Sequence, residues 1–447
     1  MLTVHGYRVP KKGNDVLALK KRLTVRPYVN PSFMKPQYVP RYPVFHEDAD
    51  YLYVPKQFGL ENWGTPETLR NVPKTDARHW TFTGALRPNQ MDVVNTMLLP
   101  EPHDGIISLQ TGGGKTVCAL YIASKLCLPT LVIVHNTFLR DQWEERIRSF
   151  VPNARIGRVQ ADKCEVKDKD FVIAMLQTVS MKELDIKVFE PIGFVIVDEC
   201  HHIASEVFVQ ALPKVTSKYM LGLSATPERK DKLMFVINWL LGPMLFKSDT
   251  GDSVDTQVSV EMYEYENTDP KFNEIIYSSS GMTCVPLMVN KLAECEDRTR
   301  WITKIVEDVL DEGRQILVLT DRVQHAKDLY SGLSDEIRER ACILGQGVKS
   351  DVRAVYLKTK AILIATYSMC KEGFDCPTLN TLVMATPRPD VDQIVGRILR
   401  VEKSVRTLHP IIIDIVDPQF RRQFQERNTL YRKRQYQIQK MKMQIEK

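Results

Sequence analysis

Five short apolar runs in the first half of the chain constrain its fold most strongly. They are Ile106–Leu109, Thr130–Val134, Phe171–Met175, Phe194–Val197 and Met220–Leu223. None of them alternates polar with apolar residues, and strands of this kind are covered on both faces of a sheet. Amphipathic stretches between the runs supply covering helices at Asn89–Leu99, Thr116–Leu126 and Thr137–Phe150. The pattern predicts a doubly wound α/β domain with a parallel sheet over residues 82–242.

The same pattern returns later in the chain. Apolar runs recur at Gln315–Leu319, Cys342–Leu344, Ala361–Ala365, Thr381–Ala385 and Pro410–Ile415, with helical stretches at Thr299–Glu312 and Val391–Val401. A second α/β domain is therefore predicted over residues 298–419. The irregular stretch between the domains, residues 243–297, is predicted to be an inter-domain connection or insertion. Residues 420–447, basic and rich in Gln, are predicted to form a C-terminal helix.

The first 81 residues have a different texture. Six prolines between Pro27 and Pro55 interrupt helices, so short strands and loops are expected. The stretch Pro43–Pro55 resembles a hairpin, because polar residues His46–Asp50 turn the chain before the alternating residues Tyr51–Val54. We predict a small β-rich N-terminal domain.

Composition and charge narrow the class of protein. Of 447 residues, 43% are apolar and 26% charged, which suits a globular chain of several domains. The nine cysteines include no C-x-x-C pair, which argues against a zinc site or a disulfide framework. No apolar stretch is long enough for a membrane span or has the form of a signal peptide, so a cytoplasmic, intracellular protein is expected.

The net charge of +6 is concentrated at the two ends. Residues 1–45 hold nine Lys or Arg and one Asp, and residues 420–447 hold nine Lys or Arg and two Glu. Basic segments of this kind bind nucleic acid, but they also occur as solvated surfaces. Charge alone does not decide between the two interpretations.

A glycine-rich segment, Gln110–Thr116, follows one predicted strand and opens a helix. Glycines at such a position let backbone amides close around phosphate oxygens at the helix N-terminus. Lys115 would contact the β- and γ-phosphates of ATP, and Thr116 would bind Mg²⁺ through its hydroxyl. Gly112, Gly113 and Gly114 would permit the close approach of the backbone to the nucleotide.

Two carboxylates follow another predicted strand, at Asp198 and Glu199. Ligands of α/β sheets bind outside the carboxyl ends of the strands, where both acids are expected. Asp198 can hold Mg²⁺ through water, and Glu199 can act as the base for the attacking water. Adjacent His201 and His202 are assigned no metal, because no third ligand is evident.

These segments, taken in order with Ser224–Pro227, resemble motifs I, II and III of superfamily 2 helicases. Further stretches resemble other motifs of that superfamily: Leu86–Gln90, Val134–Trp143, Ala174–Val179, Ala365–Asp375 and Gln393–Arg400. The similarity covers residues 85–405 and is greatest to the XPB branch and the phage UvsW-type fork-remodelling helicases. It implies two tandem RecA-like domains with ATP between them.

The resemblance also implies roles for individual residues. Gln393, Arg397 and Arg400 would act in catalysis, with both arginines on one helical face as arginine fingers. Ser224 and Thr226 would couple the nucleotide to domain motion. The remaining nucleotide-binding residues would be Arg87, Gln90, Gln110, Thr111, Gly373 and Asp375.

DNA is the expected partner: single strand in the motor, and duplex or a branched junction at the N-terminal domain. Hydroxyls and cations of the strand-facing motifs suit backbone phosphates, so little sequence preference is expected. The candidate contacts are Thr137, Arg140, Gln177, Thr178, Thr320, Arg322 and Thr366. In the N-terminal domain, basic and aromatic residues could grip duplex or could equally pack in a core: Arg26, Tyr28, Phe33, Lys35, Tyr38, Arg41 and Tyr42.

The sequence therefore predicts an ATP- and Mg²⁺-dependent DNA helicase or translocase that remodels forks and branched junctions. Three alternatives remain open. An RNA helicase shares the same core, and the motor subunit of a nuclease or restriction assembly would need a nuclease constellation that this chain does not display. An inactive nucleic-acid-binding scaffold would be signalled by loss of Lys115, Glu199 or Arg397, and all three are present.

Overall fold

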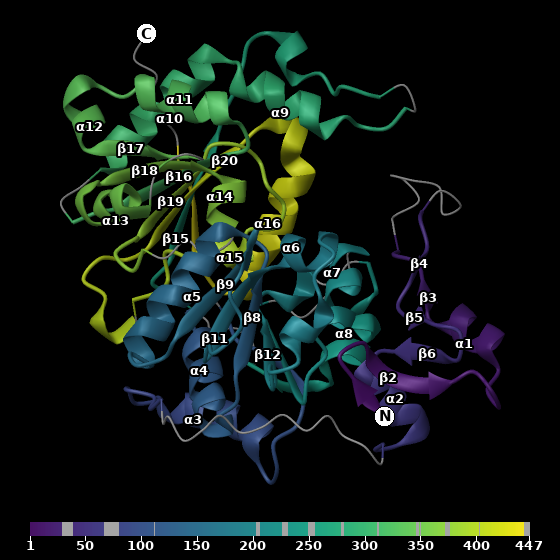
Figure 1. The fold of residues 1–447 in the computed structure, drawn as a ribbon. Coiled ribbons are helices and arrows are strands. Elements are labelled where there is room, and N and C mark those ends of the chain that lie inside the picture. The colour runs from purple at the N-terminus through teal and green to yellow at the C-terminus, as the bar shows by residue number, and fades with distance from the viewer. Residues whose placement is uncertain are drawn as a thin grey trace. The chain divides into compact units, whose positions relative to one another are not determined.

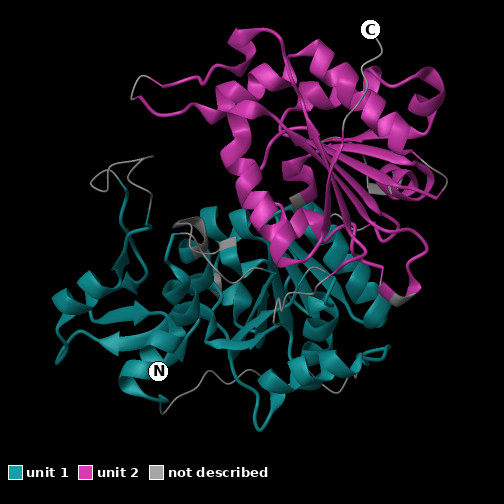
Figure 2. Cartoon of the chain, turned by 180° about the vertical axis from the view of Figure 1, so that it is seen from behind, with its two compact units in different colours: residues 1–249 teal, residues 250–447 magenta. Residues whose placement is uncertain are grey.

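The computed structural model describes residues 1–28, 39–66, 80–110, 112–202, 206–225, 231–248, 255–278, 281–310, 313–345, 348, 350–371, 376–401 and 403–441. The chain divides into two compact units, residues 1–249 and 250–447 (Figure 2). Each unit is built around one large sheet.

The sheet of the first unit has eight strands in the order β10-β9-β11-β8-β12-β13-β7-β14. They are β7 (Gly105–Ser108), β8 (Thr130–Val134), β9 (Ile156–Gln160), β10 (Lys163–Cys164), β11 (Phe171–Met175), β12 (Phe194–Val197), β13 (Tyr219–Ser224) and β14 (Met244–Lys247). Every pairing is parallel except that of β10 with β9. The five strands predicted for this domain are confirmed to within two residues at each end.

Helices cover both faces of this sheet (Figure 1). One face packs against α3 (Pro88–Leu98), α4 (Lys115–Leu126) and α5 (Thr137–Phe150), and the other against α6 (Leu176–Met181), α7 (Glu206–Ala211) and α8 (Met234–Leu241). Successive strand residues therefore enter different cores: Val132 packs with the first group and Ile133 with the second. Burial on both faces explains why the strand sequences do not alternate.

The second unit contains a seven-stranded parallel sheet in the order β17-β18-β16-β19-β20-β15-β21. Its strands are β15 (Ser259–Glu264), β16 (Ile316–Thr320), β17 (Ala341–Leu344), β18 (Ile362–Thr366), β19 (Thr381–Met384), β20 (Ile411–Val416) and β21 (Gln437–Met441). Helices α9 (Val285–Ala293), α10 (Glu296–Val309), α11 (Val323–Ser331) and α12 (Asp335–Glu339) precede α13 (Ser350–Thr359), α14 (Tyr367–Lys371), α15 (Asp392–Val395) and α16 (Arg421–Lys433). Hydrophobic clusters lie on both faces of the sheet, so this unit, like the first, is a doubly wound α/β domain, as predicted.

Two segments differ from the sequence-based expectation. Residues 243–297 are not simply irregular, because β14 completes the first sheet and β15 pairs between β20 and β21 in the second. The C-terminal helix ends at Lys433, and β21 follows as an edge strand. An edge strand is held by backbone pairing, so its side chains can stay polar and exposed and leave no apolar pattern.

The N-terminal part is β-rich, as predicted. An antiparallel sheet has the order β1-β2-β6-β5, from β1 (Leu2–Thr3), β2 (Gly6–Pro10), β5 (His46–Glu47) and β6 (Tyr51–Val54). Strands β3 (Thr24–Val25) and β4 (Tyr42–Pro43) pair separately, and the helices are α1 (Val16–Arg22) and α2 (Lys56–Trp63). The predicted hairpin is confirmed, but His46 and Glu47, expected in the turn, form β5. The turn is closed by Asp48 Oδ1, which accepts from the Asp50 and Tyr51 amides.

A buried ion pair joins the N-terminal part to the first large sheet. Lys56 Nζ at the start of α2 lies 2.6 Å from Asp104 Oδ2, which immediately precedes β7, and both side chains are buried. Lys56 also donates to the Lys218 carbonyl at 2.7 Å, beside β13. Nearby, the rings of Phe58 and Trp239 of α8 meet edge to face at 5.1 Å. Both contacts pack helix α2 of the N-terminal part against the rest of the first unit.

Replacing Lys56 with Met should leave the Asp104 carboxylate buried without its cation. We expect the free energy of unfolding to fall by about 3–5 kcal/mol, the range for breaking a buried pair, measured by urea denaturation. The control is Lys20→Met, which removes a pair with Glu47 on the exposed surface and should have little effect. Equal, small effects of both changes would contradict a stabilising role for the buried pair.

Candidate active site

The glycine-rich segment has the backbone shape needed for phosphate binding. It leaves β7 and enters α4, and Gly114 caps the helix in the left-handed region, with φ of 87°. Gly112 has φ of 84°, a region that side-chain-bearing residues rarely adopt. A Cβ at Gly114 would also lie 2.2 Å from Gln90 Nε2. Both glycines are therefore required by the backbone.

Lys115 reaches from the first turn of α4 towards the carboxylates that follow β12. Its Nζ donates to the Leu109 carbonyl at 3.3 Å and lies 3.8 Å from Glu199 Oε1. Strand pairing explains this proximity, because β13 lies between β7 and β12 and all three are parallel. Their carboxyl ends share one edge of the sheet. Thr116 follows Lys115 in the same helical turn.

Asp198 is a buried carboxylate held at both oxygens. Oδ2 accepts from the indole N–H of Trp143 at 2.8 Å, and Oδ1 accepts from the Glu199 amide at 2.9 Å. Burial, reinforced by the charge of Glu199, raises the pKa of Asp198 to about 6, against the opposing effects of Trp143 and Lys115. A cation beside Asp198 would relieve this penalty, and carboxylate and hydroxyl oxygens are the donors that Mg²⁺ prefers. Asp198 and Thr116 therefore fit a magnesium ion.

Glu199 has a strained backbone, with φ of 48°. Its Oε2 lies 3.3 Å from Nδ1 of His201, and the same nitrogen lies 3.0 Å from the hydroxyl of Ser224 at the end of β13. His201 thus bridges the predicted base and the predicted coupling residue. The sequence analysis gave His201 no role, because the only role considered for the two adjacent histidines was metal binding.

Arg87 and Gln90, two of the predicted nucleotide-binding residues, lie next to the glycine-rich segment. Gln90 is 6% exposed, its Oε1 accepts from the Arg87 amide at 3.0 Å, and its Nε2 donates to the Gly113 carbonyl at 3.2 Å. Gln90 therefore braces the loop through its amide. Gln110 is tied to the segment after β14, since its amide donates to the Ser248 hydroxyl at 3.2 Å.

Four of the predicted nucleic-acid contacts lie at the carboxyl ends of β8 and β11, which pair directly. Thr137 opens α5, and Arg140 in the next turn contacts Asp141 and Gln160. On α6, Gln177 Nε2 donates to the His135 carbonyl at 2.8 Å, and Thr178 Oγ1 accepts from the Ala161 amide at 3.2 Å. Because β12 is the next strand, this group shares its sheet edge with Asp198.

The predicted contacts in the second unit differ in accessibility. Thr320 is fully buried and its hydroxyl is 2.8 Å from Nδ1 of His325, so its assignment as a strand contact is wrong for this conformation. Arg322 donates to the Asn290 side chain and the Pro286 carbonyl, both on α9. Thr366 lies beside Thr320 at the end of β18, where its hydroxyl is 3.0 Å from that of Ser368.

The two predicted arginine fingers do not lie on a regular helix. Helix α15 contains Gln393 but ends at Val395, with Gly396 as its C-cap. Tight turns follow, in which the Arg397 amide bonds to the Ile394 carbonyl at 2.9 Å. Arg397 is 7% exposed and Arg400 is partly exposed. The expected single helical face is thus replaced by a turn, because glycine weakens the helix at this point.

Several predicted residues lie outside the described part of the chain: Thr111, Thr226, Gly373, Asp375, Phe33, Lys35 and Tyr38. Of the other N-terminal candidates, Tyr42 is a core residue, whereas Tyr28 is exposed beneath the Lys232 ammonium. Arg26 and Arg41 are exposed, and the pairing of Val25 with Tyr42 places them next to each other.

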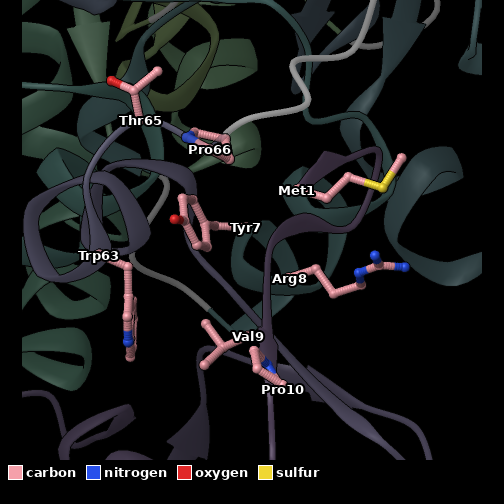
Figure 3. A pocket seen from close by; sticks show the side chains of 8 residues that line it. All are labelled: Met1, Tyr7, Arg8, Val9, Pro10, Trp63, Thr65 and Pro66. Carbon is pink, nitrogen blue, oxygen red and sulfur yellow. The ribbon is translucent and has the colours of Figure 1, made fainter.

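The N-terminal sheet also forms a cavity of about 430 Å³ that the sequence did not indicate. Figure 3 shows Trp63 on one side of it and Arg8 with Met1 on the other. Its lining is formed by Met1, Tyr7, Arg8, Val9, Pro10, Trp63, Thr65 and Pro66.

Two tandem RecA-like α/β domains define the class of fold, and in the first a glycine-rich segment lies beside two carboxylates. Comparisons with known proteins identify the family. Residues 83–229 match the family model described as "Type III restriction enzyme, res subunit". A protein of Acanthamoeba polyphaga mimivirus, named as an ATP-dependent RNA helicase, is 32% identical, and the match covers 98% of this chain and 86% of that protein. A protein of African swine fever virus with the same kind of name is 27% identical, with 96% and 88% covered.

The chain belongs to helicase superfamily 2. Among solved structures, T4 UvsW is similar with a TM-score of 0.36 and 16% identity, and the match covers 95% of each chain. The Sulfolobus solfataricus SWI2/SNF2 ATPase core in complex with double-stranded DNA has the same TM-score and identity, with 76% of this chain and 89% of that chain covered. Among the described helices, none has the length and apolar character that crossing a membrane requires.

Asp198→Asn should alter how stability depends on pH. Asp198 binds its proton more tightly in the folded protein, so the stabilisation it contributes is present below pH 3.8 and is lost as pH rises through about 6. A shift from 3.8 to about 6 corresponds to about 3 kcal/mol. As pH rises from acidic to alkaline without Mg²⁺, the natural chain should lose about 3 kcal/mol of its free energy of unfolding that the variant keeps. Thermal unfolding in EDTA at several pH values measures the difference. If the stability of the two proteins depended on pH in the same way, burial would not raise the pKa of Asp198.

Proposed function

We propose that this superfamily 2 helicase hydrolyses ATP with Mg²⁺ to translocate along DNA and to remodel forked or branched DNA. The observation that carries the proposal is the position of Lys115, Asp198 and Glu199 at one sheet edge. The ammonium of Lys115 is 3.8 Å from Glu199, and Asp198 is adjacent. Arg140 and Gln177 lie at the same edge, so the proposed nucleotide-binding residues and nucleic-acid contacts are positioned by the same sheet.

The chemistry follows from these positions. ATP phosphates bind at the N-terminus of α4, where free amides and the Lys115 ammonium favour negative charge. Asp198, through water, and Thr116 would hold Mg²⁺, which would offset charge on the phosphate oxygens. Glu199 accepts a proton from water as the water oxygen bonds to the γ-phosphorus. The bond from that phosphorus to the β-phosphate oxygen then breaks, giving ADP and phosphate.

Two further roles complete the proposed cycle. Arg397 and Arg400 are proposed to supply positive charge to the transferred phosphoryl group, and Gln393 keeps its proposed catalytic role from the resemblance. Loss of the γ-phosphate changes the environment of Glu199, and His201 passes that change to Ser224 through contacts of 3.3 and 3.0 Å. Gly373, Asp375, Thr111 and Thr226 keep their proposed nucleotide and coupling roles from the resemblance.

The substrate is proposed to be DNA, held through its backbone by Thr137, Arg140, Gln177, Thr178, Arg322 and Thr366. RNA is the second candidate, because the relatives from mimivirus and African swine fever virus are named RNA helicases. ATPase stimulation separates the two when single strand, duplex, fork, four-way junction and RNA of matched sequence are compared. Stimulation by the fork and junction above that by single strand supports the proposal, and stimulation by RNA alone would overturn it.

Glu199→Gln should bind ATP and nucleic acid normally but hydrolyse ATP about 10²- to 10⁴-fold more slowly, because water lacks its base. Single-turnover hydrolysis and equilibrium nucleotide binding measure the two effects separately. Lys115→Ala provides the comparison, since losing the phosphate contact should weaken ATP binding as well as turnover. A Glu199→Gln variant with normal hydrolysis would place the base elsewhere.

The N-terminal part is proposed to contact duplex or junction DNA through its exposed cations. Arg26→Glu together with Arg41→Glu should weaken binding of a forked DNA more than of single strand. Two lost phosphate contacts should reduce the slope of log affinity against log salt concentration by about 1.8, measured by fluorescence anisotropy. Lys125→Glu is the control, because Lys125 lies in the last turn of α4, at the opposite end of that helix from Lys115. An unchanged slope in the double variant would argue against this contact.

A further inference from the structure

Trp143 connects α5, the helix that carries the proposed nucleic-acid contacts Thr137 and Arg140, to the carboxylate of Asp198. It lies on the buried face of α5 with Leu139 and Ile147, and it is 1% exposed. Its indole N–H does not point into the apolar core but donates to Asp198 Oδ2 at 2.8 Å. A leucine or phenylalanine would fill the same core without this bond. The polar atom therefore requires an explanation beyond packing.

The bond determines which way the Asp198 carboxylate points. The Glu199 amide bonds to Oδ1 and Trp143 to Oδ2, so rotation of the carboxylate would break one of the two bonds. Hydrogen bonds that include a charged group are stronger than neutral ones. Of the two donors, the amide belongs to the same loop as Asp198, whereas the indole comes from a different helix. The orientation of Asp198 thus depends on the position of α5.

The same helix carries two of the proposed strand contacts, Thr137 and Arg140. Arg140 is one turn before Trp143, about 4.5 Å along the helix axis. In the structure its guanidinium contacts Asp141 and Gln160, acceptors that a backbone phosphate would replace. A helix moves as a rigid rod over one turn, and the planar indole has only two rotatable bonds. A shift of α5 at Arg140 therefore also moves the Trp143 indole, which is bonded to Asp198.

We infer that Trp143 is a positioning residue through which nucleic acid at the start of α5 aligns Asp198 for the nucleotide-bound metal. The inference rests on the proposed function for the assignment of the strand contacts and of Asp198. It makes binding of nucleic acid and of nucleotide mutually reinforcing, because the coupling free energy between two sites is reciprocal. Trp143 itself contacts neither ligand.

The experiment measures this coupling without hydrolysis. Affinity of the full chain for a non-hydrolysable ATP analogue with Mg²⁺ is determined with and without a saturating single-stranded oligonucleotide, and the ratio of the two values is the coupling factor. Trp143→Phe removes the donor and keeps an aromatic ring. A second variant carries at position 143 the tryptophan isostere in which sulfur replaces the indole N–H, which preserves volume. Trp80→Phe controls for the loss of a buried indole in the same core cluster.

In the natural chain the coupling factor should lie within about 5- to 150-fold. Both changes at residue 143 should bring it close to one, while the separate affinities stay within about threefold and Trp80→Phe leaves coupling intact. Unchanged coupling in the sulfur isostere overturns the inference and leaves the proposed function standing, even if Trp143→Phe fails to fold. A natural chain that binds the analogue but shows no response to any oligonucleotide overturns both.

Discussion

Parallel pairing of five neighbouring strands, β11-β8-β12-β13-β7, is the constraint on which the whole site depends. Parallel strands end at one edge, so segments that are distant in the sequence become neighbours there. The phosphate loop follows β7, the acidic pair follows β12, and Ser224 ends β13. The strand-contact residues follow β8 and β11. The proposed catalytic residues of the first unit and its proposed nucleic-acid contacts therefore follow strands of one sheet.

Two energetically unfavourable features occur at the end of β12 in the first unit. Asp198 is buried beside another carboxylate, and Glu199 adopts a left-handed backbone conformation. Both features are costly in isolation, and they persist because the surrounding sheet is packed on both faces. Trp143 and the Glu199 amide determine the direction of the Asp198 carboxylate. A cation beside Asp198 would lower the cost of burying the two neighbouring carboxylates.

Buried ion pairs join helices to the large sheet of each unit. Lys56 and Asp104 attach the N-terminal part to the first sheet. In the second unit, Arg298 of α10 donates from Nε and Nη2 to the two oxygens of Asp417, and Arg427 of α16 does the same to Asp414 of β20. From sequence, these residues resemble ordinary surface charges, because nothing local distinguishes a buried arginine from an exposed one. Only the tertiary partner identifies it.

The sequence by itself determined the buried strands, the glycine loop and the acidic pair, because each depends on local pattern: continuous apolar residues, backbone freedom or adjacent charges. It could not find β15 or β21, because both pair with strands that are distant in the sequence and β21 is mostly polar. It placed Thr320 among exposed contacts and Arg397 on a long helix, and burial and the cap at Gly396 decided otherwise. Tertiary structure alone assigned Trp143 and His201 their partners, because a hydrogen bond between elements depends on distances in space that no spacing along the chain encodes.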